Sequence, residues 1–323
     1  MKKQTIIFIT LGIIVSLISI PSLNAEKVFK VGIFQIVSHP ALDANRKGFI
    51  DGMAEAGYKE GKNINYDIQN AHGDISTCNT IAQKFVREKV DMIVAIATPN
   101  AQAAAKATKT IPIILGTLTD PVAAGIAKSW ESSGRNVTGV ASKAPMDKTV
   151  ELFLEVYPKL KKLGVLYNAG EKNSVDEVKE LEKVANQKGL KLIHASVATS
   201  ADVMIATQSL VGRVDAITTP KDNTVVSGLE GGLKVARKAK IPFFAMDVAT
   251  VKRGAVAALG VDFYELGKNA SKKAVRVLEG EKPENIPISM AEKFFIWINL
   301  KAANDFGLTI SEEVLNKADN VIK

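Results

Sequence analysis

Cysteine and histidine are scarce in this sequence, which holds one cysteine and three histidines in 323 residues. The single cysteine, Cys78, excludes an internal disulfide, and its position excludes a lipid-modified cysteine near residue 25. His39, His72 and His194 are not spaced as paired ligands, so the sequence predicts no metal site. Cys78 lies in a helical pattern, and we interpret it as a small core residue rather than a nucleophile.

Motifs that mark common catalytic and nucleotide-binding sites are also absent. The chain has no G-x-S-x-G elbow, no G-x-x-x-x-G-K-[ST] phosphate loop, no G-x-G-x-x-G fingerprint and no H-E-x-x-H pair. We therefore predict no catalytic residue and no cofactor, and an enzyme is the less favoured class. Paired carboxylates such as Asp222 and Asp247 leave action on a sugar open as the enzymatic alternative.

Only one apolar run approaches the length of a membrane span. It covers residues 5–20, follows Lys2 and Lys3, and is followed by a short segment that ends at Ala25 before the first charged residues. A run of about 16 residues is short for a bilayer, which needs roughly 20, and this order of segments is typical of a secretory signal peptide. We predict that residues 1–25 are a cleaved signal peptide and that the exported protein is periplasmic.

Positive charge exceeds negative charge only modestly. The formal net charge is +8, and it falls to +6 once Lys2 and Lys3 are removed with the signal peptide. The excess is spread along helical patterns instead of being gathered in one arm, which is typical of solvated helix faces. We predict no nucleic-acid partner, and contact with a membrane only through another protein.

Short β-rich runs alternate with helical patterns along most of the chain. Residues 29–36, 91–97 and 111–116 are apolar and rich in β-branched residues, and helical patterns lie between them. Strands and helices that alternate at this spacing predict an α/β fold with parallel sheets covered on both sides.

The second half of the chain repeats the first. Residues 30–34, KVGIF, are echoed by residues 162–166, KLGVL, and two further pairs of segments follow at offsets of 130 to 132 residues. Coincidence is the alternative, but matches in one order at nearly constant spacing predict two similar Rossmann-like lobes. We place an N-terminal lobe at residues 26–141 plus 262–290, and a C-terminal lobe at residues 142–261 plus 291–323.

Ligands of open parallel sheets bind beyond the carboxyl ends of the strands, so two facing lobes predict a cleft lined by those loops. The loops are rich in hydroxyl, amide and carboxylate groups, which indicates recognition by hydrogen bonds. The predicted ligand-binding residues are Gln35, Ser38, His39, Thr98, Pro99, Thr119, Asp120, Asn168, Ser174, Asp222, Asn223, Thr224 and Asp247.

Helix N-termini in these loops favour a carboxylate ligand, because their amides are unpaired and the helix dipole is positive there. The hydroxyls of Ser38, Thr98, Thr119 and Ser174 are candidates to assist, and Asp247 or Asp120 is a candidate partner for an ammonium group. The alternative is that these residues only cap helices or form turns.

Five segments resemble the ABC transporter substrate-binding proteins of the tryptophan/tyrosine type. They are residues 35–43 (QIVSHPALD), 97–101 (ATPNA), 119–122 (TDPV), 222–225 (DNTV) and 260–267 (GVDFYELG). The resemblance implies a type I periplasmic-binding-protein fold with three crossings between lobes, a closing hinge, and an ABC permease and ATPase as partners. It also implies an aromatic amino acid as ligand, namely tryptophan, tyrosine or phenylalanine.

On this resemblance, Asp247 binds the α-ammonium group of the ligand, and the aromatic ring needs an apolar wall. Phe34, Tyr167, Phe244 and Met246 are the candidates for that wall, although core packing is the alternative for Phe34 and Phe244. The family often has serine or glutamate after the aspartate of the last binding loop, whereas this chain has Val248. A nucleoside, a sugar or another small metabolite stays open as the ligand, and so does a role as a sensory binding module.

Overall fold

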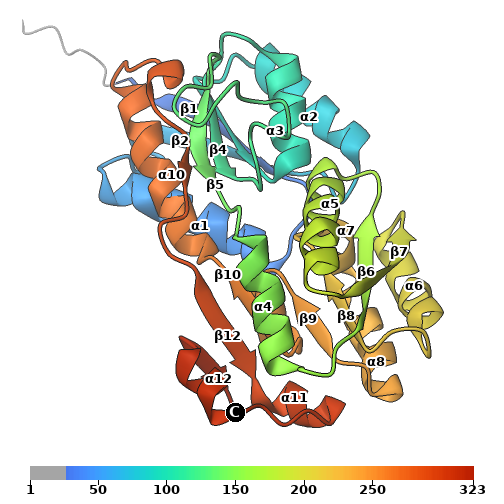
Figure 1. The fold of residues 1–323 in the computed structure, drawn as a ribbon. Coiled ribbons are helices and arrows are strands. Elements are labelled where there is room, and N and C mark those ends of the chain that lie inside the picture. The colour runs from blue at the N-terminus through green and yellow to red at the C-terminus, as the bar shows by residue number, and fades with distance from the viewer. Residues whose placement is uncertain (1–26) are drawn as a thin grey trace, which may run out of the picture.

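The computed structural model describes residues 27–323. The predicted signal peptide lies outside the described residues. Figure 1 shows two lobes, with the first half of the chain mainly in the upper lobe and the second half mainly in the lower one. Across residues 27–323, no helix combines the length and the apolar character that a membrane crossing requires.

The first lobe is built on a six-stranded sheet whose paired strands are all parallel. In spatial order its strands are β11 (Ser289–Met290), β5 (Val137–Ala141), β4 (Ile113–Thr117), β3 (Met92–Ile96), β1 (Phe29–Gln35) and β2 (Ile64–Asn70). Its helices are α1 (Pro40–Glu55), α2 (Ile75–Arg87), α3 (Thr98–Ala107) and α10 (Phe263–Leu278), with the 3-10 turn η2 (Pro283–Asn285). In Figure 1, α1 and α10 cover one face of the sheet, and α2 and α3 cover the other.

The second lobe has a four-stranded parallel sheet, β7 (Lys191–Val197), β6 (Lys162–Asn168), β8 (Ala216–Thr219) and β9 (Phe243–Ala245). The strands β10 (Ala257–Gly260), β12 (Phe295–Asn299) and β13 (Asn320–Ile322) extend it. A hydrogen bond from the amide of Val256 to the carbonyl of Phe243, 2.7 Å long, joins the two parts. Because β12 runs antiparallel to β10, the prediction of wholly parallel sheets is corrected at this edge.

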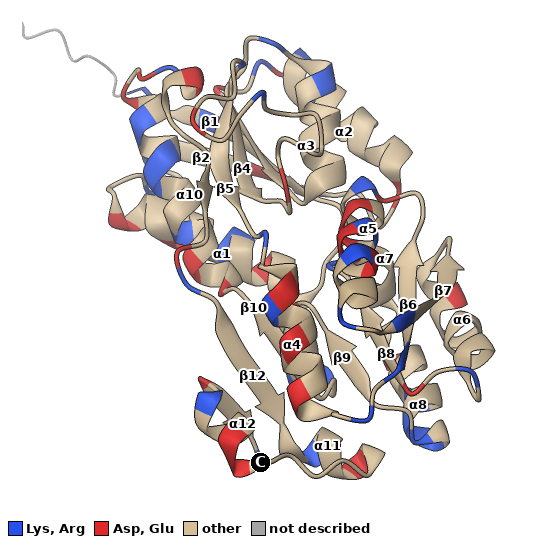
Figure 2. Ribbon diagram, in the orientation of Figure 1, with Lys and Arg blue, Asp and Glu red and all other residues tan. Residues whose placement is uncertain are grey.

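Short helices cover both faces of this second sheet. They are α4 (Met146–Val156), α5 (Lys172–Gln187), η1 (Ser200–Asp202), α6 (Val203–Leu210), α7 (Asn223–Ser227), α8 (Leu229–Ala239), α9 (Val248–Arg253), α11 (Leu300–Phe306) and α12 (Glu312–Lys317). Figure 2 shows basic and acidic residues interspersed over the helices of both lobes.

The internal repeat predicted from the sequence is confirmed by the strand order. The run β2-β1-β3-β4 of the first lobe has the same connectivity as β7-β6-β8-β9 of the second. Gly32 of β1 and Gly164 of β6 occupy equivalent positions, and a methyl group added at either would lie within 2.8 Å of a helix side chain, Phe85 or Leu210. The lack of a side chain lets a helix pack closely on the strand in both lobes.

Each lobe has its own hydrophobic core. The first core draws on residues between 31 and 140 and between 261 and 288, and includes buried Cys78. The second draws on residues between 146 and 259 and between 298 and 314. The chain therefore passes between the two cores three times, and the predicted α/β fold with two Rossmann-like lobes is confirmed.

Candidate functional site

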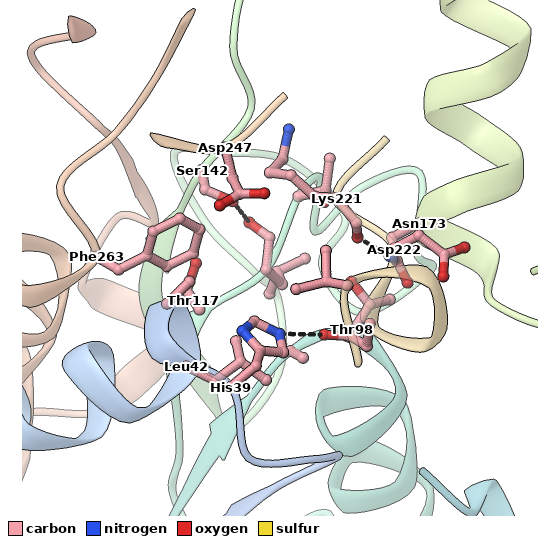
Figure 3. Close-up of a pocket in the computed structure, with 16 residues that line it drawn as sticks. His39, Leu42, Thr98, Thr117, Ser142, Asn173, Lys221, Asp222, Asp247 and Phe263 are labelled. Atoms are coloured by element: carbon pink, nitrogen blue, oxygen red, sulfur yellow. Dashed lines mark hydrogen bonds between the residues drawn. The ribbon is translucent and has the colours of Figure 1, made fainter. Parts of the chain in front are cut away.

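A cavity lies between the lobes, where the loops that follow the strands face each other (Figure 3). About 40 Å³ of it admits the centre of a water molecule, which is room for a few waters, so the cavity is narrow. The cavity is lined by His39, Ala41, Leu42, Ala97, Thr98, Thr117, Leu118, Thr119, Ser142, Asn173, Lys221, Asp222, Asn223, Val226, Asp247 and Phe263.

Sheet topology explains why these residues meet. In the first lobe β3 runs into Thr98 and β5 runs into Ser142, and in the second lobe β9 runs into Asp247. The carboxyl ends of parallel strands lie at one edge of a sheet, so residues distant in sequence converge there. The two edges face each other, so both lobes contribute to the cavity wall.

The backbone at the start of α3 is strained. Ala97 has φ 79° and ψ 158°, a region that glycine occupies readily and other residues avoid. Its amide donates to the carbonyl of Thr117 over 2.9 Å, which holds the loop in place. Strain of about 1 to 3 kcal/mol at such a residue is typical of ligand-binding loops, and here it directs the N-terminus of α3 at the cavity.

Six of the thirteen residues predicted to contact ligand line this cavity. They are His39, Thr98, Thr119, Asp222, Asn223 and Asp247. The first three belong to the first lobe and the last three to the second, so an occupant would touch both lobes. Ligand contact by each of them stays a prediction.

Two predicted residues of the first loop, Gln35 and Ser38, are bonded to Asp43 instead. The side chain of Gln35 donates to Asp43 over 2.8 Å and accepts from Arg46 over 2.7 Å. The Ser38 hydroxyl is exposed and donates to Asp43 over 2.7 Å. These bonds fix the loop before α1, which places the next residue, His39, at the cavity.

The other five residues predicted to contact ligand, Pro99, Asp120, Asn168, Ser174 and Thr224, also lie outside the cavity lining. Asp120 accepts from two backbone amides of its own turn and pairs with Lys143 at 3.1 Å, as the turn alternative predicted. The amide side chain of Asn168 donates to the hydroxyl of Thr224 over 2.8 Å. Pro99 and Ser174 are buried within the first turns of α3 and α5.

Asp247 combines a capping role with a place at the cavity. Its side chain is 3% exposed and accepts from the amide of Thr250 over 2.9 Å and from the Thr250 hydroxyl over 2.5 Å. A carboxylate offers about four lone-pair sites, so two further hydrogen bonds remain available. Helix capping and ligand contact are therefore compatible at this residue.

A second carboxylate, Asp222, is buried beside Glu171. Burial, and next the charge of Glu171, raises the pKa of Asp222 to about 7. The Asp222 side chain accepts from the amides of Asn168 and Val225 over 2.5 and 2.7 Å. Glu171 accepts from the side chain of Asn223 over 2.5 Å. This network holds the loop before α7 rigidly against the cavity.

One hydrogen bond joins the lobes at the cavity wall. The Nε2 atom of His39 lies 3.5 Å from Oδ1 of Asn223 (Figure 3). The amide group of Asn223 already donates to Glu171, so its oxygen must be the acceptor and His39 must carry the proton on Nε2. Burial lowers the pKa of His39, which keeps the ring neutral and leaves Nδ1 as an acceptor.

The sequence did not point to several residues of the wall. Thr117, Ser142, Lys221 and Phe263 line the cavity but were not among the predicted contacts. Ser142 directly follows a strand, so the rule used for the other loops would have found it. Phe263 lies at the start of α10, directly after the lobe boundary predicted between residues 261 and 262, but the loop rule was not applied there.

The apolar part of the wall also differs from the expectation. Phe34 packs edge-on against Phe85, and Phe244 stacks on Phe153, so both belong to the cores as the alternative predicted. Met246 is buried in the second core, and Tyr167 lies against His194. The apolar lining within the described residues comes instead from Ala41, Leu42, Ala97, Leu118, Val226 and Phe263.

A two-lobed α/β fold with a polar-lined cavity between the lobes defines a periplasmic-binding type of protein. Residues 30–322 match the family described as ABC transporter substrate binding protein, and the chain belongs to that family. The resemblance inferred from the five sequence segments is therefore confirmed. Substrate-binding proteins of ABC transporters are extracytoplasmic and serve transport.

Two similar proteins have a ligand that is known. The chain is 44% identical over 276 residues to a tyrosine-binding protein of Clostridioides difficile, covering 85% of this chain and 80% of that one. It is 36% identical to a Streptococcus pneumonia protein solved in complex with L-Trp, with a TM-score of 0.88, covering 92% of this chain and all of that one.

The lobes are placed more like those of the L-Trp complex than those of an open relative. A ligand-free, open substrate-binding protein with adhesive properties from Clostridium difficile is 39% identical, covering 92% of this chain and 99% of that one, yet its TM-score is only 0.68. Because its identity is close to that of the complex with L-Trp, the lower score reflects the placement of the lobes, not the sequence. The narrow cavity agrees with closure.

Proposed function

We propose that this protein is the periplasmic binding component of an ABC importer and that it binds an aromatic amino acid without catalysing a reaction. A permease and an ATPase are its partners, and residues 1–25 are the signal peptide that exports it. The observation that carries the proposal is the cavity between the lobes, with the buried carboxylate Asp247 on one side and the N-terminus of α3 on the other.

An amino acid supplies the charges that this cavity is built to receive. The α-ammonium group pairs with Asp247, whose buried carboxylate has acceptor sites left. The α-carboxylate lies at the N-terminus of α3, where backbone amides and the hydroxyls of Thr98 and Thr119 donate. Phe263 and Leu42 then face the aromatic ring.

Closure of the lobes follows from contacts to both of them. We take the lobes as residues 26–141 plus 262–290, and 142–261 plus 291–323, hinged at three crossings. Thr98 lies in the first lobe and Asp247 in the second, so one zwitterion held by both lowers the free energy of the closed form alone. A ligand that contacts one lobe alone would not change the balance between the open and closed forms.

A thermal-shift screen tests the proposal. The mature protein is unfolded, freed of ligand, refolded, and screened against the twenty amino acids, nucleosides and sugars. A ligand at 100 times its dissociation constant adds about 2.7 kcal/mol to the free energy of unfolding, a shift of several degrees. We expect aromatic amino acids alone to raise the midpoint. A response to sugars or nucleosides only would reject the amino acid and leave the binding fold.

The variant Asp247→Asn ties the result to the site. Asparagine keeps the helix cap but removes the charge, so we expect affinity to fall by about 2 kcal/mol, roughly thirtyfold. Asp262→Asn is the matched control, because Asp262 also caps a helix and lies outside the cavity lining. Equal affinity of both variants in titration calorimetry would refute the role of Asp247.

A further inference from the structure

Three polar atoms of residues that line the cavity are buried without a hydrogen-bond partner among residues 27–323. Oγ1 of Thr117 and Nδ1 of His39 belong to the first lobe, and Oδ1 of Asn173 belongs to the second. A buried polar atom that stays unpaired costs about 1 to 3 kcal/mol, so the two atoms of the first lobe indicate a ligand group that pairs with them.

His39 determines which kind of ligand group fits. Its Nε2 proton is directed at Asn223, whose amide orientation is fixed in turn by Glu171. The remaining nitrogen, Nδ1, is therefore a bare acceptor at the cavity. An occupant that satisfies it must bring an N–H or O–H donor.

A bulge in the sheet brings Thr117 to the cavity. On β4, Leu115 pairs with Ala95 and Thr117 pairs with Ile96, so Gly116 is an extra residue between them. Bulges of this kind re-aim side chains and recur beside functional sites. Thr117 is 2% exposed, and Figure 3 draws it between Phe263 and Leu42, the apolar residues that face the ring.

We propose that Thr117 and His39 form the polar end of the side-chain pocket and select an aromatic amino acid whose ring carries a hydrogen-bond donor. A phenol O–H or an indole N–H supplies that donor, whereas the plain phenyl ring of phenylalanine leaves both atoms unpaired. Pockets built to bond a polar ligand group reject the analogue that lacks it. The inference rests on the proposed function and refines its ligand class.

The first test compares tyrosine, tryptophan and phenylalanine on the refolded wild-type protein by titration calorimetry. We expect phenylalanine to bind roughly tenfold more weakly or worse than the better of the other two, because it leaves buried acceptors unpaired. Phenylalanine that binds as tightly as both would overturn the inference while leaving the proposed function intact. No binding by any of the three would instead reject the proposed function itself.

Variants then assign the preference to the two atoms. Thr117→Val keeps the shape and removes the hydroxyl, and His39→Gln removes Nδ1 while its amide still reaches toward Asn223. Each should reduce the preference for the donor-bearing ring severalfold, because the donor-bearing ligands lose a hydrogen bond and phenylalanine no longer buries an unpaired acceptor. Thr117→Ser, which restores a hydroxyl, should recover most of the preference.

Thr218→Val is the matched control. Thr218 is also a fully buried threonine at a strand end, and its hydroxyl has no partner among the described residues, but it lies outside the cavity lining. It should leave all three affinities in their wild-type order. Equal weakening of the three ligands by Thr117→Val would show that the hydroxyl serves the shared α-amino acid group, which contradicts a selective role.

Discussion

At the scale of single residues, the pair Asp222 and Glu171 places two carboxyl groups in a buried network. Water is excluded there, so an ionised Asp222 lacks solvation and meets the charge of Glu171. These two effects raise the pKa of Asp222 from 3.8 to about 7. The native state therefore holds a proton that the unfolded chain releases.

Removal of this ionisable group makes stability less dependent on pH. Because the folded pKa of Asp222 is the higher one, its contribution to stability is complete below the unfolded value and is lost as pH rises through about 7. We expect the melting temperature of Asp222→Asn, relative to wild type, to rise between pH 4 and 7 and to stay level above. Calorimetric melting of both proteins across this pH range measures the difference in melting temperature. A difference that does not change with pH would contradict the raised pKa of Asp222.

At the scale of elements, the contact of α1 with α10 holds Phe263 at the cavity. A methyl group at Gly267 of α10 would lie 2.1 Å from the carbonyl oxygen of Asn45 and 2.7 Å from the amide of Phe49. Both atoms belong to the backbone of α1, which cannot move aside without shifting the helix. Glycine at this position sets the spacing between the two helices.

The substitution Gly267→Ala should separate these helices. Overpacking typically costs about 1 to 3 kcal/mol, which exceeds the gain of about 1 kcal/mol from the better helix former. We expect a lower denaturation midpoint in urea and weaker ligand binding, since Phe263 lies one turn away. Gly231→Ala in α8 is the control, because its nearest neighbour is a side-chain atom of Met204 at 3.3 Å. If both variants were equally stable, the close contact at Gly267 would not be what sets the spacing between α1 and α10.

At the scale of the whole molecule, a chain of charges spans the first crossing. Lys143 lies between β5 and α4 and contacts Asp120 of the first lobe at 3.1 Å and Glu180 of α5 in the second at 3.4 Å. Both pairs are partly exposed, so each is worth about 1 kcal/mol or less. Lys143 lies at the crossing itself, so the two contacts together link Asp120 of the first lobe to Glu180 of the second and favour the present placement of the lobes.

Loss of that contact should shift the balance between open and closed forms. We expect Glu180→Gln to weaken every ligand alike by up to roughly fivefold, and the unliganded protein to be more extended in small-angle scattering. Glu182→Gln is the control, because Glu182 is on the same helix and contacts only His194 of its own lobe, at 3.8 Å, among the described ion pairs. Equal scattering and affinity for the two variants would argue against a role in closure.

Much of the architecture was predictable from the sequence. Hydrophobic periodicity is local, so it predicted strands such as residues 29–36, and the repeat of KVGIF as KLGVL predicted two lobes of one plan. The rule that ligands lie beyond strand ends also placed Thr98 and Asp247 at the cavity. These inferences succeeded because each is read from short sequence patterns and needs no knowledge of tertiary contacts.

Tertiary structure alone decided which side chains of each loop face the ligand. Ser38 and His39 are adjacent, yet one bonds Asp43 at the surface and the other reaches across to Asn223. Thr117 faces the cavity because of a bulge, and Phe263 does so because α10 packs on α1. Local sequence determines that a loop is polar and near a strand end. Its contacts depend on bulges, helix packing and the second lobe, and these involve residues far away in the chain.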